Sequence, residues 1–202
     1  TVSEDYIGEM AGLSLRNVEL TIRNGKKILY QDFGEMMFTH KGITGPLVLS
    51  ASSSIGKQLK KQGTLEGYID LKPALSSEQL DERILREFEN AKNKQFKNVI
   101  GVLFPSSLTP VIIRLGGIPE DKVIHEISRE ERLNFVSIIK AFPFTIDGLG
   151  GYSEAVITKG GISVKEINPG TMESKKIPQL YFAGEVLDLD AVTGGYNLQI
   201  AW

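Results

Sequence analysis

The first part of the chain follows the two-residue alternation of apolar and polar positions that is typical of β-strands. Residues 13–22 (LSLRNVELTI) alternate with one change of phase at Arg16–Asn17, and this change predicts a β-bulge. Asn24–Gly25 favours a tight hairpin turn, because both residues tolerate positive φ. The apolar run after this turn is therefore predicted to return as the partner strand.

The stretch that follows the hairpin is less regular. Residues 47–56 fit a helix and a strand equally well, and residues 64–71 alternate again and predict a strand. We therefore predict a β-rich, barrel-like domain over residues 1–75.

Apolar positions at helical spacing replace the alternation over residues 76–142. Serines that can act as N-caps indicate three helix starts, at Ser76 with Gln79, at Ser128 with Glu131, and at Ser106 or Ser107. The connections between these helices are short, so this part is predicted to form a small helical bundle.

Glycine-punctuated apolar stretches return over residues 143–202. Residues 180–183 (LYFA) predict a buried strand, which leads into an acidic loop and a glycine turn that enters a helix. The chain starts at Thr1 and ends at Trp202 without a stop signal, so we interpret it as an excised piece. The predicted fold is α+β, in which the barrel-like part and the bundle are inserted into an α/β domain represented only by its C-terminal part.

Composition narrows the possible functions. The 202 residues include 23 Lys and Arg against 25 Asp and Glu, so the net charge is −2 and no overall basic excess indicates nucleic acid or anionic membrane as a partner. Cysteine is absent, which excludes disulfides and zinc–thiolate sites and leaves nothing to favour secretion over the cytoplasm. No His or carboxylate pair has metal-ligand spacing, and we predict no metal site.

The strongest candidate chemistry follows the predicted strand at 180–183. Acidic and glycine residues gather there, namely Gly184, Glu185, Asp188, Asp190, Gly194 and Gly195. In open α/β sheets, ligands bind beyond the carboxyl ends of strands and against helix N-termini. Carboxylates can accept hydrogen bonds from sugar or ribityl hydroxyls, and glycines let the backbone approach a ring or a phosphate. An ordinary strand-to-helix turn with solubilising acids fits the same spacing.

Residue identities favour the first interpretation. AGEVLDLDAVTGGYNLQIAW resembles the C-terminal FAD-binding segment of the BaiN-like or aminoacetone-oxidase-like bacterial NAD(P)/FAD-dependent oxidoreductases. GLSLRNVEL, GEMMFTHKGITGP and the segment that contains TMESK resemble the same family in the same order. The resemblance thus covers nearly the whole chain, and the helical middle is the least distinctive part.

The resemblance implies an FAD domain interrupted by a barrel-like and a helical domain. It places Gly184, Glu185, Asp188 and Asp190 along the ribityl and pyrophosphate side of FAD. Backbone N–H groups of Gly194, Gly195, Asn197 and Leu198 would face the flavin ring. The family's GxGxxG half is missing, so we expect the chain alone to bind FAD weakly or not at all.

His40, in the glycine-rich stretch THKGITGP, is the candidate catalytic residue, because a histidine titrates near neutral pH and can act as an acid–base group beside a flavin. A turn in which the glycines set the backbone and His40 makes one structural hydrogen bond is the simpler interpretation of the same residues. The predicted function is therefore part of an FAD-dependent oxidoreductase that uses NAD(P)H, by resemblance, and a small-molecule substrate. The alternatives are an interaction module without catalysis and a flavoprotein that acts on nucleic acid.

Overall fold

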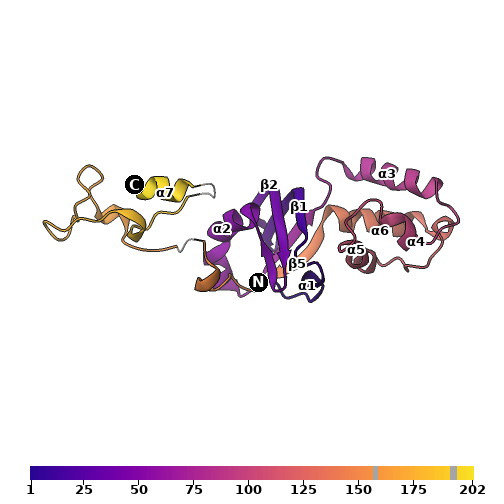
Figure 1. Cartoon of the computed structure of the whole chain (residues 1–202), viewed down its shortest axis with the longest axis horizontal. Coiled ribbons are helices and arrows are strands. Elements are labelled where there is room, and N and C mark those ends of the chain that lie inside the picture. Colours follow the sequence, from indigo (N-terminus) through magenta and orange to yellow (C-terminus); the bar gives the residue numbers. More distant parts are fainter. Residues whose placement is uncertain (157–158, 192–194) are drawn as a thin grey trace. The chain divides into compact units, whose positions relative to one another are not determined.

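The computed structural model describes residues 1–156, 159–191 and 195–202. These residues form two compact units, Thr1–Gly148 and Leu149–Trp202 (Figure 1). The first unit contains an antiparallel sheet and most of the helices, and the second consists of short turns and one short helix.

The sheet of the first unit has five strands in the order β3-β2-β1-β4-β5, and every neighbouring pair is antiparallel. The strands are β1 (Ser14–Asn24), β2 (Lys27–Thr39), β3 (Gly42–Thr44), β4 (Leu65–Asp70) and β5 (Phe142–Ile146). The amide of Val2 donates to the carbonyl of Lys41, and the amide of Ser3 donates to Thr145. The N-terminal segment therefore bridges from the β2–β3 turn to β5, which closes the curled sheet toward a barrel.

The predicted hairpin and bulge are both confirmed. Asn24 is the last residue of β1 and pairs with Lys27, so the two turn residues are Gly25 and Lys26, one position later than predicted. Gly25 has a φ of 57°. The pairing of β1 with β2 shifts between Leu15 and Val18, where Asn17 adopts a φ of 57°. Local sequence therefore determines this hairpin and its irregularity.

Helix α2 (Pro46–Gln62) covers the apolar face of the curled sheet, and the ambiguous stretch 47–56 lies within it. Its buried residues recur every four positions, at Leu47, Ala51, Ile55 and Leu59. This spacing places them on one side of a helix, where they pack with the alternate buried positions of the strands. A short helix, α1 (Tyr6–Glu9), precedes the sheet.

The helical part of the first unit lies between β4 and β5. It contains α3 (Ser77–Glu89), α4 (Phe96–Ile100), α5 (Thr109–Gly116) and α6 (Arg129–Lys140), with a 3₁₀ turn at Ile124–Glu126. Edge-to-face aromatic contacts join four buried rings at its centre, those of Phe88, Phe96, Phe104 and Phe135. This aromatic cluster is the centre of the predicted bundle.

Two of the three predicted caps are confirmed. Ser76 and Ser128 each form a complete capping box, with Gln79 and Glu131 respectively. The prediction that Ser106 or Ser107 caps the third helix is wrong, because α5 starts at Thr109 without a side-chain cap. The amides of Leu108 and Thr109 instead donate to the carbonyl of Pro105, so backbone hydrogen bonds satisfy the donors at the start of this helix.

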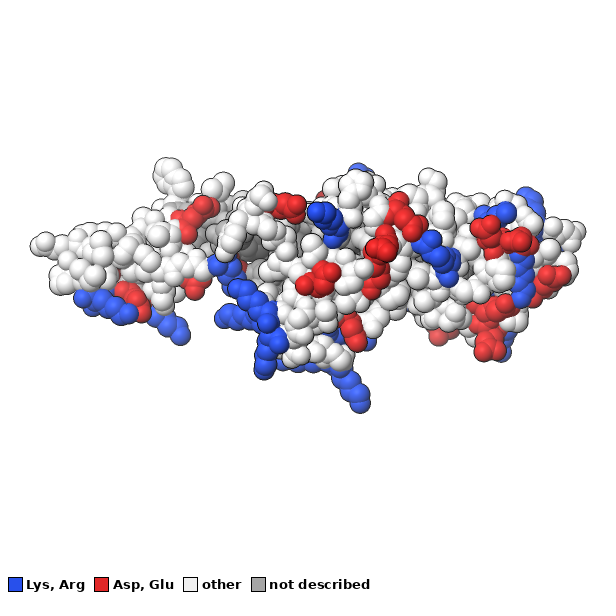
Figure 2. Space-filling view, turned by 90° about the horizontal axis from the view of Figure 1, so that it is seen from below, with Lys and Arg blue, Asp and Glu red and all other residues white. Residues whose placement is uncertain are grey.

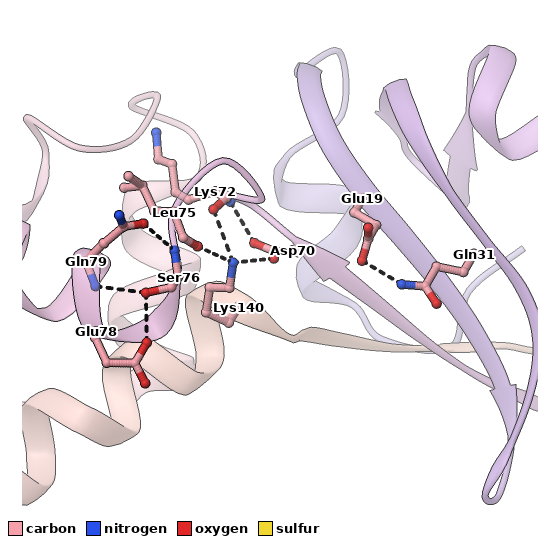
Figure 3. Close-up of polar contacts among 9 residues, drawn as sticks. All are labelled: Glu19, Gln31, Asp70, Lys72, Leu75, Ser76, Glu78, Gln79 and Lys140. Carbon is pink, nitrogen blue, oxygen red and sulfur yellow. Dashed lines mark hydrogen bonds and ion pairs between the residues drawn. The ribbon is translucent and has the colours of Figure 1, made fainter.

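A partly buried lysine joins the sheet to the helices (Figure 3). The ammonium group of Lys140 donates to the carbonyls of Leu75, at 2.7 Å, and Lys72, at 3.2 Å, and forms an ion pair with Asp70. The amide of Lys72 donates to the carboxylate of Asp70. These bonds fix the chain where it leaves β4 and enters α3.

The second unit has little buried apolar surface. Ile167 and Leu187 are its buried hydrophobic residues among those described. Its elements are short 3₁₀ turns at Tyr152–Glu154, Val164–Glu166 and Gly184–Val186, and the six-residue helix α7 (Tyr196–Ala201). Its segments are held together mainly by single β-bridges and backbone hydrogen bonds.

Candidate functional site

The predicted strand at 180–183 is not formed. Tyr181 makes one bridge, to Glu173, and its side chain is 58% exposed. A strand of a parallel sheet needs a hydrogen-bonded strand on each side and burial on both faces. Among the described residues, the segment 180–183 has one such neighbour, at Glu173. The prediction of a buried strand at 180–183 is therefore wrong.

The acidic and glycine residues after this segment nevertheless adopt a defined backbone. Gly184 has a φ of 81° and starts a 3₁₀ turn, and Gly195 has a φ of 87° and lies directly before α7. At both positions a Cβ atom would meet open space, so the positive φ rather than crowding favours glycine. Gly194, the neighbouring predicted site residue, lies outside the described residues.

A close crossing of two backbone segments positions the acidic turn. Ile162 and Leu187 form a parallel bridge, in which the amide of Ile162 donates to Val186 and the amide of Asp188 donates to Ile162, both at 2.9 Å. Gly161 has a φ of 146°, and a Cβ atom there would overlap the carbonyl oxygen of Val186. Gly161 thus allows one part of the chain to approach another at this crossing.

The predicted carboxylates differ in their surroundings. Glu185 and Asp188 are exposed, whereas Asp190 is half-buried and accepts a 2.9 Å bond from the ammonium group of Lys159. Glu185 and Asp188 are therefore the more accessible hydrogen-bond acceptors for ligand hydroxyls.

The side chain of Asn197, the second residue of α7, bonds to the backbone of Ala191. Its side-chain oxygen accepts a bond from the amide of Ala191 at 2.8 Å, and its side-chain nitrogen donates to the carbonyl of Ala191 at 3.2 Å. The first helical bond across the start of α7 joins the amide of Gln199 to the carbonyl of Gly195. The side chain of Asn197 therefore has a structural role. The backbone amides of Asn197 and Leu198, which the resemblance assigned to the flavin ring, lie ahead of the first hydrogen bond within α7.

The stretch TMESK forms a structural turn in the second unit. The amide of Met172 donates to Asn168, and the carboxylate of Glu173 accepts from the amide of Gln179, both at 2.7 Å. The amide of Phe182 donates back to Met172. The polar groups of this turn bind the chain itself and hold the segment that leads to Gly184.

His40 lies in the first unit, on the exposed turn between β2 and β3. It therefore belongs to a different unit from the residues at 184–198. The Nδ1 atom of the other histidine, His125, lies 3.0 Å from the carbonyl oxygen of Lys92. This is a structural contact.

One pocket in the described part of the first unit was not indicated by the sequence. It has a volume of about 540 Å³ and lies between α3 and the loop that follows α4. Its lining combines the cations Lys72, Arg83 and Arg86 with apolar side chains, including Leu103 and Phe104. These residues are up to 32 positions apart along the chain, so no local pattern marks them as neighbours.

The residues that the structure describes contain no group of three or more His, Cys, Asp or Glu side chains that could hold a metal ion. None of their helices combines the length and apolar character needed to cross a membrane.

Comparison with known proteins places these features in context. Residues 1–157 match the family model described as "HI0933-like protein barrel and H2TH domain". The chain is 35% identical over 200 residues to a ribosomal RNA dihydrouridine synthase of Haemophilus influenzae, and this match covers 99% of the chain and 46% of the relative.

Two further relatives have similar coverage. A ribosomal RNA dihydrouridine synthase of Escherichia coli is 33% identical, over 96% of the chain and 44% of the relative. A 3-dehydro-bile acid delta(4,6)-reductase of Clostridium scindens is 29% identical, over 88% of the chain and 44% of the relative. The chain thus spans less than half the length of each of these proteins.

Proposed function

The chain belongs to the HI0933-like family, and on this basis we propose that it forms part of an FAD-dependent oxidoreductase that uses NAD(P)H. The family match over residues 1–157 carries the proposal. The names of the relatives support it, because a dihydrouridine has two more hydrogens than uridine, and a reductase likewise adds hydrogen. Both names describe a two-electron reduction, and a bound flavin supplies such chemistry.

The described part of the segment 184–198 fits the ribityl side of such a cofactor by the chemistry of its groups. Glu185 and Asp188 present exposed carboxylates that can accept hydrogen bonds from hydroxyls. Gly184 and Gly195 leave open space where a side chain would stand. We propose that these residues, with Asp190 and the backbone amides of Gly194, Asn197 and Leu198, bind the cofactor.

His40 is proposed as the group that supplies a proton. Reduction of a carbon–carbon double bond adds a hydride to one carbon and a proton to the other, so an acid is needed. The imidazole of His40 is exposed, and histidine is the side chain that most often acts as a general acid. A His40→Gln variant would then lower kcat without changing flavin content, whereas unchanged kcat would assign His40 to the turn alone.

Two substrate classes are candidates. A small molecule is the class that the sequence indicates, and the bile acid reductase supports it. RNA is the second class, and the two ribosomal RNA dihydrouridine synthases support it.

The absorption spectrum of a purified protein of the relatives' full length that contains this chain tests the proposed function. A flavoprotein shows bands near roughly 375 and 450 nm. Under anaerobic conditions the band at the longer wavelength should bleach on addition of NADPH or NADH. A protein that is colourless after mild purification and does not take up added FAD would contradict the proposal.

A further inference from the structure

One end of the sheet in the first unit carries a concentration of positive charge, which we call the basic end. The hairpin between β1 and β2 and the last two turns of α2 contribute its members, which are Arg23, Lys26, Lys27, Lys57, Lys60 and Lys61. All six side chains are exposed. Figure 2 shows basic side chains projecting together from the middle part of the molecule, along the lower edge of the view.

The topology brings the two elements to the same edge. Arg23 pairs with Glu66, the second residue of β4, so the hairpin turn lies beside the start of β4. Helix α2 ends at Gln62, three residues before β4 starts at Leu65. The end of α2 must therefore lie close to the hairpin.

The lysines of α2 form an exposed stripe on this helix. Lys57, Lys60 and Lys61 are spaced by three and four positions, which places them side by side on a helix surface. The buried residues Ile55 and Leu59 fix the opposite side against the sheet. The three ammonium groups are therefore displayed together on a rigid element.

These cations lack the acidic partners that other cations of this unit have. Arg132, Lys122 and Lys140, for example, form ion pairs of 2.5 to 2.7 Å with carboxylates. By contrast, no carboxylate oxygen of the described residues lies within 4 Å of a nitrogen in the basic end. Arg23 instead lies over the ring of Tyr68, 5.4 Å from its centroid.

We propose that the basic end binds the phosphate backbone of RNA. Six cations at one end of the sheet, none of which forms an ion pair with another described residue, create a local positive potential although the whole chain has a net charge of −2. A polyanion neutralises such a surface best, because each phosphate contact releases counterions. The Tyr68–Arg23 pair adds an aromatic group of the kind that stacks on unpaired bases.

The choice of RNA rests on the proposed function, because RNA is one of the two substrate classes that the proposed function allows. It also agrees with the printed activity of two relatives. The prediction that nucleic acid is not a partner used the net charge of the whole chain, which averages the basic end with acidic regions elsewhere.

The test measures binding of the chain to a fluorescent single-stranded RNA at 50 to 200 mM salt, without flavin. The variant is Lys57→Gln/Lys60→Gln/Lys61→Gln. The matched control is Lys92→Gln/Lys94→Gln/Lys97→Gln, which removes the same charge from exposed positions elsewhere in this unit. Circular dichroism checks that each variant is folded.

We expect the variant to bind at least about tenfold more weakly, with a salt slope that is smaller by about 2, because each lost contact with single-stranded RNA contributes roughly 0.7. The control should stay within about twofold of the original chain. Equal losses in both variants, no binding at 50 mM salt, or tighter binding to vesicles with 30% phosphatidylglycerol would each overturn the proposal. Because flavin is absent from this assay, its failure leaves the proposed oxidoreductase untouched.

Discussion

The ammonium group of Lys140, at the end of α6, lies 2.5 Å from a carboxylate oxygen of Asp70, at the end of β4. The two side chains are only 20% and 13% exposed. The same ammonium group also satisfies the carbonyls of Lys72 and Leu75. One side chain therefore connects the sheet, the entry to α3 and the end of α6 (Figure 3).

Replacing Lys140 with methionine should destabilise the chain by about 2–4 kcal/mol, because Asp70 and two carbonyls would lose their partner in a partly buried position. Urea unfolding followed by circular dichroism measures this change. The control is Lys97→Met, whose 3.7 Å pair with Glu120 is exposed and whose loss should cost less than about 1 kcal/mol. Similar losses in the two variants would contradict the role assigned to Lys140.

Gly67 in β4 lies opposite Phe144 in β5, and a Cβ atom at Gly67 would overlap the Phe144 ring. Gly67→Ala should therefore displace this buried ring and cost about 1–3 kcal/mol of unfolding free energy. The matched change Gly101→Ala meets open space at a φ of −58° and should change stability by less than about 1 kcal/mol. Equal thermal unfolding midpoints for the two variants would show that the ring moves freely.

Local signals in the sequence account for much of the first unit. The signals are the hairpin at Gly25–Lys26, a change of phase at Asn17 and the two capping boxes, and each involves residues within a few positions of one another. Stretch 47–56 could not be assigned in this way, because both periods fit it. The packing of α2 on a sheet built from distant strands decides for the helix.

In the candidate site, by contrast, local sequence does not predict what each residue contacts. Resemblance selected the residues at 184–198, but the roles of Asn197 and Asp190 inside the chain depend on partners at Ala191 and Lys159. The pocket beside α3 and the basic end are assembled from segments that the fold brings together. Composition averaged over the chain conceals such local groups, because opposite charges elsewhere cancel them.

The carboxyl group of Glu131 should make stability depend on acid pH. A hydrogen bond from Lys122 and bonds from the amide and hydroxyl of Ser128 lower the pKa of Glu131 from 4.5 to about 2. A lowered folded pKa stabilises the fold above the unfolded pKa, and this contribution disappears as the pH falls from about 4.5 toward 2.

The unfolding free energies of the original chain and Glu131→Gln, measured at pH 7, 4 and 2.5, test this. Their difference should be largest at pH 7 and should shrink through the two lower values, because glutamine retains the cap but not the charge. Glu130→Gln is the matched control, because it makes the same charge change on the neighbouring residue of α6 and leaves the bonds from Lys122 and Ser128 to Glu131 in place. A difference for Glu131→Gln that stays constant down to pH 2.5 would be inconsistent with the lowered pKa.

The crossing at Gly161 links the architecture of the second unit to the proposed cofactor. Gly161→Ala would place a methyl group against the carbonyl of Val186 at a φ of 146°, which should break the bridge between Ile162 and Leu187. This bridge positions the turn from Gly184 to Asp188. In a protein of the relatives' full length, the variant should therefore lose at least about half of its bound flavin, read from the ratio of absorbance near roughly 450 nm to that of the protein.

Gly151→Ala is the matched control, because Gly151 lies in the same unit at a φ of −69° and a Cβ atom there would meet only the Ser153 hydroxyl at 3.8 Å. It should retain its flavin. The unfolding midpoint of each variant separates the two ways in which flavin can be lost. A Gly161→Ala protein that unfolds at the original temperature but lacks flavin assigns the crossing to cofactor binding. A Gly161→Ala protein that keeps all of its flavin would show that cofactor binding does not depend on the turn at Gly184.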